Sequence, residues 1–297
     1  MMPNGWWGCG TALVTPFRRD GTVDEPALRA LVDWQIGQGI HFLVPCGSTG
    51  EAATMTPAEH RRVVEIVVEQ GNKRVRIVAG AGSNDTRKAI ATSREMRAAG
   101  ADALLHVSPM YNKPPQRGIV AHFLAIADAT DLPIIVYNVP GRTGSNIEPK
   151  TTLALAEHPR IVAVKEASGS LPQIIDVIRD APDGFEVLSG DDALTIGVMS
   201  AGGTGLISVI SNVAPKLTAA LVERCASEDY AEARRVHHQL LPLMSAAFIE
   251  SNPIPAKALL AMMRKVENVL RLPLVPLDGK YDAMMRDALD ALGEHSR

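Results

Sequence analysis

The chain has 297 residues, of which 46% are hydrophobic and 21% are charged, and its formal net charge is −3. This length and composition suit one large soluble domain, or two ordinary ones, around a substantial core. The lysines and arginines are scattered rather than clustered, which excludes the basic patch that a nucleic-acid or membrane-surface partner would need.

Short apolar, β-branched runs recur at fairly even intervals, and stretches with apolar residues at helical spacing lie between them. Parallel strands that are buried on both faces read as continuous apolar runs of this kind. The sequence therefore predicts repeated strand–helix units. The predicted strands are 12–15, 42–45, 76–79, 103–107, 134–137, 161–164, 186–188 and 205–209, and the clearest predicted helices are 56–70, 85–98 and 116–129.

Repeated strand–helix units form either a doubly wound sheet or a closed barrel. Eight evenly spaced strands favour the α/β fold of the (β/α)8 TIM barrel, which needs about 250 residues. We expect the barrel and its catalytic site in residues 1–224. Residues 225–297 are expected to form an appended helical region, with helices at 230–241 and 257–265 and no linker before it.

Local signals fix some helix ends. Thr56, Pro57 and Glu59 have the order of an N-cap, a proline in the first turn and a capping-box glutamate. Gly71 and Gly100 stand where the predicted helices should end.

The functional side chains of a TIM barrel gather at the carboxyl ends of its strands. Lys165 follows the apolar run 161–164, so strand alternation aims it into the barrel mouth, whereas Glu166 points to the other face and is structural. A buried lysine has a lowered pKa, and a neutral amine attacks ketones. The alternative is a lysine that reaches solvent or pairs with Glu166.

Other strand ends supply hydroxyls and one guanidinium. Tyr111 and Tyr137 are candidates for proton transfer, although a tyrosine at such a position is often only a core residue with a satisfied hydroxyl. Ser48 and Thr49 lie in a Gly-Ser-Thr-Gly-Glu turn that suits a carboxylate. Arg142, in a Gly-Arg-Thr-Gly loop, is either a carboxylate clamp or an ordinary surface arginine.

A metal site is not expected. The histidines form no HxH or HExxH pair, and Cys9, Cys46 and Cys225 are far apart, as free thiols of a reducing cytosol are. The adjacent Asp191 and Asp192 read as a helix cap. No secretory signal or membrane-spanning apolar stretch is visible, so a cytoplasmic location is predicted.

These segments together resemble the dihydrodipicolinate synthase/N-acetylneuraminate lyase family of class I aldolase-type lyases. The resemblance runs nearly end to end, in the order and spacing of the family. The matching segments are 47–51, 137–144, 164–167, 188–192, 202–212 and Asn252-Pro253-Ile254-Pro255-Ala256-Lys257.

The resemblance implies a chemistry without metal or added cofactor. Lys165 would form a Schiff base with pyruvate, while Tyr137, Ser48 and Tyr111 would relay protons. Thr49 would share the binding of the pyruvate carboxylate with Ser48. The remaining implied contacts are the backbones of Gly190 and Ile207 with the keto acid, and Arg142 with the carboxylate of the second substrate, L-aspartate 4-semialdehyde.

The implied product is 4-hydroxy-tetrahydrodipicolinate, an intermediate of lysine and diaminopimelate biosynthesis. The implied assembly is a homotetramer, a dimer of dimers in which Tyr111 reaches the neighbouring site. Two alternatives stay open: a pyruvate-dependent lyase or dehydratase for a sugar acid or another 2-keto acid, and a catalytically silent regulatory or binding homologue.

Two departures from the family pattern concern Ser48, where threonine is usual, and Met110, where a tyrosine is usual. Met110 also belongs to the site at which lysine inhibits many relatives. Of that site the sequence keeps His60, Asn84 and the backbone positions Ala52 and Ala53, but places Pro57 for a histidine and Lys88 for a glutamate. A cationic Lys88 repels the effector's ammonium, so insensitivity to L-lysine is predicted.

Overall fold

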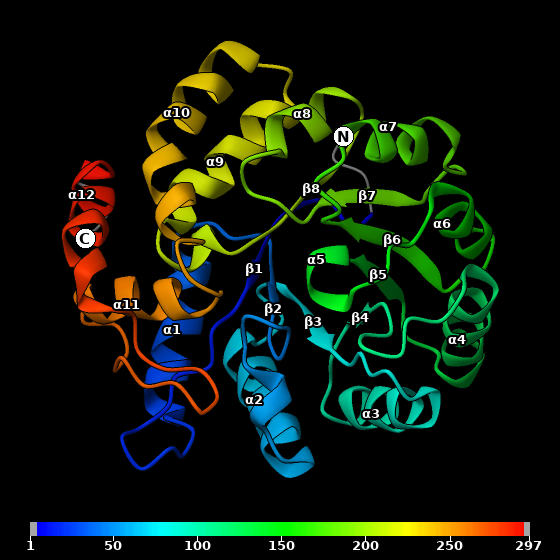
Figure 1. Cartoon of the computed structure of the whole chain (residues 1–297), viewed down its shortest axis with the longest axis horizontal. Coiled ribbons are helices and arrows are strands. Elements are labelled where there is room, and N and C mark those ends of the chain that lie inside the picture. Colours follow the sequence, from blue (N-terminus) through cyan, green and yellow to red (C-terminus); the bar gives the residue numbers. More distant parts are fainter. Residues whose placement is uncertain (1–4, 294–297) are drawn as a thin grey trace.

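The computed structural model describes residues 5–293. Eight parallel strands follow one another around a closed barrel, and the first pairs with the last in the register Gly8 with Gly205 (Figure 1). The predicted TIM barrel is confirmed. The strands are β1 Gly8–Ala12, β2 Phe42–Val44, β3 Arg76–Gly80, β4 Ala103–Val107, β5 Ile134–Asn138, β6 Ile161–Glu166, β7 Glu186–Ser189 and β8 Gly205–Ser208.

Helices surround the barrel, and none within residues 5–293 is long and apolar enough to cross a membrane (Figure 1). The α-helices are α1 Glu25–Gly37, α2 Pro57–Gly71, α3 Thr86–Ala98, α4 Gln116–Ala129, α5 Pro140–Thr143, α6 Pro149–Ala156, α7 Leu171–Asp180, α8 Thr195–Ser200, α9 Pro215–Ala226, α10 Tyr230–Ala246, α11 Ile254–Met262 and α12 Asp282–Asp290. Three short 3-10 helices are η1 Ala52–Thr54, η2 Ile210–Asn212 and η3 Gly279–Tyr281.

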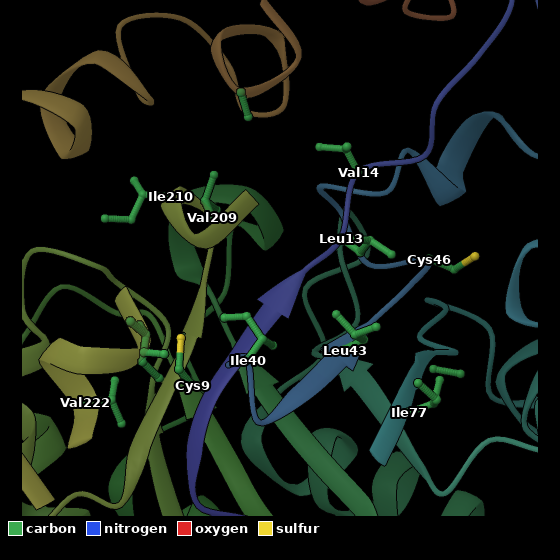
Figure 2. Packing of buried hydrophobic residues seen from close by; sticks show 14 of the residues in the cluster. Cys9, Leu13, Val14, Ile40, Leu43, Cys46, Ile77, Val209, Ile210 and Val222 are labelled. Carbon is green, nitrogen blue, oxygen red and sulfur yellow. The ribbon is translucent and has the colours of Figure 1, made fainter. Parts of the chain in front are cut away.

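The apolar residues form two layers. One fills the barrel interior, where Phe42, Leu105 and Ile135 meet. The other lies outside the sheet, and Figure 2 shows part of it, including Leu43 of β2, Ile77 of β3 and Val222 of α9. Alternate residues of each strand therefore face two different cores, which explains why the strands read as unbroken apolar runs.

The first strand differs from the prediction. It spans Gly8–Ala12 and not 12–15. Its glycines resemble a turn in the sequence, but a Cβ on Gly10 would come within 2.0 Å of the Phe42 ring. The glycine therefore makes room for an aromatic side chain that fills the barrel interior.

The predicted helix starts are confirmed. Thr56 caps α2, and the reciprocal capping box with Glu59 is present. Asp85 caps α3 without a capping box, by accepting a hydrogen bond from the Arg87 amide. At the end of α2, Gly71 is still helical and the left-handed residue is Asn72, at a φ of 44°.

The C-terminal helical region is also present. Its helix α10 extends to Ala246, past the predicted end at 241, and so continues through Pro242, although proline removes a helical hydrogen bond. Helix α11 begins at Ile254, before the predicted 257. The region packs through α10 on α9, and α12 contacts both α10 and α11 (Figure 1). Because α9 runs across residue 225, the division of the chain there stays a prediction.

Candidate active site

A pocket of about 350 Å³ opens at the carboxyl ends of the strands. A larger hollow of about 680 Å³ lies at the opposite end, around Trp6, Trp7 and Arg76 at the start of β3. Active sites of TIM barrels lie at the carboxyl ends of the strands, so the smaller pocket is the candidate active site. It is lined by most of the predicted residues: Ser48, Thr49, Tyr137, Arg142, Lys165 and Gly190.

Lys165 is the fifth residue of β6 and is only 5% exposed. Its Nζ lies 4.3 Å from the ring centroid of Tyr137, the residue paired with it on β5. The pKa of Lys165 is lowered to about 8, chiefly because the amine is buried; the carboxylate of Asp192 opposes this shift, and the nearby Arg142 adds to it. A larger share of this amine is therefore neutral near pH 7 than is usual for lysine.

The lack of a side chain at Gly190 leaves room for the side chain of Lys165. A Cβ on Gly190 would lie 3.1 Å from Cε of Lys165 and 2.7 Å from the Ala167 side chain. A side chain at this position would therefore clash with Ala167 and crowd the end of the Lys165 side chain.

Glu166 points away from the pocket, as predicted. Its buried carboxylate accepts hydrogen bonds from Asn138, Gln173 and the Ser168 amide. The ion pairs recorded among residues 5–293 do not join it to Lys165. The reading of Lys165 as the ion-pair partner of Glu166 is therefore wrong, and Glu166 instead ties β5, β6 and α7 together.

Tyr137 is 7% exposed, at the end of β5. Burial raises its pKa to about 12, with Arg142 acting in the opposite direction. Its hydroxyl therefore keeps its proton at neutral pH and is available as a donor beside the lysine.

The loop of residues 47–51 supplies two hydroxyls. Thr49 is 3% exposed and accepts a hydrogen bond from Nδ2 of Asn252 at 2.8 Å, whereas Ser48 is exposed in the pocket. Glu51 closes the loop in a left-handed conformation, at a φ of 56°. Thr15 fixes the turn by donating to the Gly50 carbonyl at 2.8 Å.

Arg142 lies in the short helix α5 and is exposed at the pocket mouth. Its Nη2 donates to the backbone oxygen of Asn252 at 3.1 Å. This one bond leaves other donors of the guanidinium fork for a carboxylate.

Two predicted residues are not brought to the pocket lining. Tyr111 is 89% exposed, with a φ of 72°, and Ile207 is fully buried in the barrel interior. Their predicted roles, a proton relay and a backbone contact, stay predictions.

Two lining residues were not assigned from the sequence, and a neighbouring residue, Asp192, was predicted only as a helix cap. Asn252 and the half-exposed Phe248 come from the connection between α10 and α11, and Asn252 belongs to a segment whose role the sequence left open. Asp192 is buried and accepts hydrogen bonds from Ser208 and from the Val209 and Ile210 amides. It therefore caps η2, which is distant in sequence, and burial raises its pKa to about 6.

Within the described residues 5–293, no cluster of three or more His, Cys, Asp or Glu side chains is arranged to hold a metal ion. The polar side chains that line the pocket supply an amine, hydroxyls, a guanidinium, the amide of Asn252 and the carboxylate of Asp191. Such a set can form a covalent imine, donate protons and bind carboxylates.

Known proteins resemble the chain in both sequence and structure. A 4-hydroxy-tetrahydrodipicolinate synthase from Koribacter versatilis is 55% identical over 91% of this chain and 90% of its own length. The chloride-inhibited dihydrodipicolinate synthase from Acinetobacter baumannii, complexed with pyruvate, has a TM-score of 0.95 and 41% identity over 97% of this chain and 99% of its own.

A dihydrodipicolinate synthase from Cyanidioschyzon merolae, solved with lysine bound, also has a TM-score of 0.95, with 40% identity over 98% of this chain and 99% of its own. The model of the dihydrodipicolinate synthetase family matches residues 6–292. The chain therefore belongs to the dihydrodipicolinate synthetase family.

Proposed function

We propose that the chain condenses pyruvate with L-aspartate 4-semialdehyde to 4-hydroxy-tetrahydrodipicolinate through a Schiff base on Lys165. The observation that carries this proposal is the buried amine of Lys165, with its lowered pKa, 4.3 Å from the Tyr137 ring in a pocket that also contains hydroxyls and Arg142. The names of the similar proteins support the same reaction.

The first steps use the lysine as a nucleophile. Neutral Lys165 attacks the ketone carbon of pyruvate, the carbonyl oxygen leaves as water, and an imine remains. Loss of a methyl proton then gives an enamine. Its carbon forms a bond with the aldehyde carbon of the second substrate, whose oxygen takes up a proton. The amine of that substrate displaces Lys165 from the imine and closes the ring.

Tyr137 is assigned to these proton transfers because its hydroxyl stays protonated at neutral pH and its ring lies against the lysine amine. In the proposed relay Ser48 and Tyr111 connect Tyr137 to solvent. The pyruvate carboxylate is proposed to bind Ser48 and Thr49, with the backbones of Gly190 and Ile207 beside the keto acid.

Substrate turnover tests this proposal directly. With pyruvate and L-aspartate 4-semialdehyde, product formation coupled to a dihydrodipicolinate reductase is expected without any added cofactor. A panel of other aldehydes tests the main alternative, a lyase for a sugar acid or another keto acid. Faster turnover with a sugar-derived aldehyde would replace the proposed substrate, and no turnover at all would leave the silent homologue.

We further propose that the working form is a homotetramer, a dimer of dimers. Tyr111 is the most exposed large hydrophobic residue that the structure records. It is absent from the lining of the pocket in the isolated chain, so the proposed relay there has Tyr137 but not its second tyrosine. Burial of such a side chain at an interface is typical of tyrosine. Sedimentation should therefore show an oligomer, and a monomer that turns over at the full rate would contradict the shared site.

Insensitivity to L-lysine is expected from the surface around Lys88. Lys88 is exposed on α3, where its ammonium repels a cationic effector, and Asn84 uses one of its two amide hydrogens in a bond to the Met110 carbonyl at 3.2 Å. A tenfold loss of affinity needs only about 1.4 kcal/mol. Inhibition should therefore be absent at millimolar L-lysine, and a midpoint below about 1 mM, roughly −4 kcal/mol of binding, would contradict this. Lys88→Glu, the matched variant, should increase sensitivity.

A further inference from the structure

The connection between α10 and α11 contacts both halves of the proposed substrate site through one residue. Asn252 lines the pocket and is 6% exposed. Its side-chain Nδ2 donates to Thr49 Oγ1 at 2.8 Å, and its backbone oxygen accepts from Arg142 Nη2 at 3.1 Å. Thr49 is assigned to pyruvate and Arg142 to the semialdehyde, so the two contacts serve different substrates.

The side chain of Asn252 is not arranged for stability alone. Its Oδ1 is buried and has no hydrogen-bond partner in the described part of the chain. A buried acceptor without a partner costs free energy of folding. Such exceptions in native structures call for a reason beyond packing. Here the hydrogen bond between Nδ2 and Thr49 fixes the orientation of the amide, and Oδ1 is left without a partner.

A second contact joins the same segment to the same loop. Lys257, in α11, is fully buried, and its ammonium pairs with Glu51, the last residue of the 47–51 loop. The Nζ also donates to the Val269 carbonyl at 2.8 Å and lies 4.2 Å from the Phe17 ring centroid. A buried pair of this kind holds its elements firmly, because removal of one partner leaves an uncompensated charge.

We propose that Asn252 and Lys257 are positioning residues, which hold the 47–51 loop so that Ser48 and Thr49 meet the pyruvate carboxylate. Asn252 orients the Thr49 hydroxyl, and Lys257 fixes the end of the loop through Glu51. The C-terminal helical region is thereby part of the pyruvate site. This inference rests on the proposed function and adds to it which residues set the affinity for pyruvate.

Asn252 offers a clean test because its two contacts are separable. Asn252→Ala removes the bond to Thr49 but keeps the backbone oxygen that holds Arg142. The pyruvate concentration for half-maximal borohydride trapping should rise about tenfold, equivalent to about 1.4 kcal/mol. The KM for the semialdehyde should stay unchanged. Ser251→Ala, at the neighbouring exposed residue, is the matched control and should change neither value.

The trapping readout needs no aldehyde, so the outcomes separate. If the wild-type chain traps no pyruvate, the proposed function fails. If it does, and Asn252→Ala has the wild-type midpoint, the positioning role of Asn252 is wrong. A purely structural role would lower the melting temperature and change both substrate constants together, which also contradicts the inference.

The ion pair gives an independent test that leaves Asn252 in place. Lys257→Met alone should destabilise the protein, because Glu51 is then buried without its partner. The double variant Glu51→Gln/Lys257→Met removes both charges and should recover the melting temperature while keeping a pyruvate midpoint about tenfold above that of the wild type. A wild-type midpoint in the double variant would show that the pair stabilises the fold without positioning the loop.

Discussion

Replacement of Lys165 by alanine is expected to lower turnover by roughly 10⁴- to 10⁶-fold, the range seen when a covalent nucleophile is removed. The side chain is buried in the pocket, and the other lining residues carry hydroxyl, amide, carboxylate, guanidinium or apolar groups. None of them supplies a second amine that could replace it. Steady-state turnover with pyruvate and the semialdehyde measures the loss. Retention of more than about a tenth of the activity would exclude Lys165 as the nucleophile.

Lys165→Arg is the matched control, because it keeps the positive charge but a guanidinium does not deprotonate. It should be as inactive as the alanine variant. The wild-type pH profile gives a second check. Below a pKa of about 8 the amine is mostly protonated, so the rate of imine formation should rise with pH and level off above 8. A rise that continues toward the ordinary lysine value of 10.5 would contradict the effect of burial.

Arg142→Ala is expected to impair use of the semialdehyde while imine formation with pyruvate persists. Loss of a charge-assisted contact costs roughly 2–4 kcal/mol when its partner is left desolvated. Because Arg142 is exposed, the lower end applies, about thirtyfold in kcat/KM for the semialdehyde.

The control for this variant is Arg179→Ala, which removes an exposed arginine of α7 outside the pocket. It should have wild-type kinetics. Equal losses of pyruvate trapping and semialdehyde use in Arg142→Ala would mean that the arginine supports the fold or the pyruvate site.

Much of the fold follows from local patterns in the sequence. The apolar runs mark the strands, and Lys165 could be located because it follows directly on such a run in β6. The capping residues Thr56 and Asp85 begin their helices as their types predict. These signals are local, since each depends on neighbours within a few residues.

The features that the sequence did not reveal depend on distant partners. Gly10 belongs to β1 because it faces Phe42, and α10 continues through Pro242 although proline usually ends a helix. Asp192 caps η2 from a loop that precedes it by many residues. Asn252 donates a hydrogen bond to Thr49, which lies 203 residues earlier in the sequence. Residue spacing carries no information on such contacts.

Borohydride reduction in the presence of pyruvate, followed by peptide mass analysis, tests most directly whether Lys165 forms the Schiff base. A strong rival site exists, since Lys257 is also buried and its pKa is also lowered to about 8, but its ammonium is held by Glu51 and the Val269 carbonyl. One pyruvate-derived mass is expected on Lys165, and it should form equally in the presence of a chelator. Label on Lys257 or another lysine, or loss of labelling with the chelator, would contradict it.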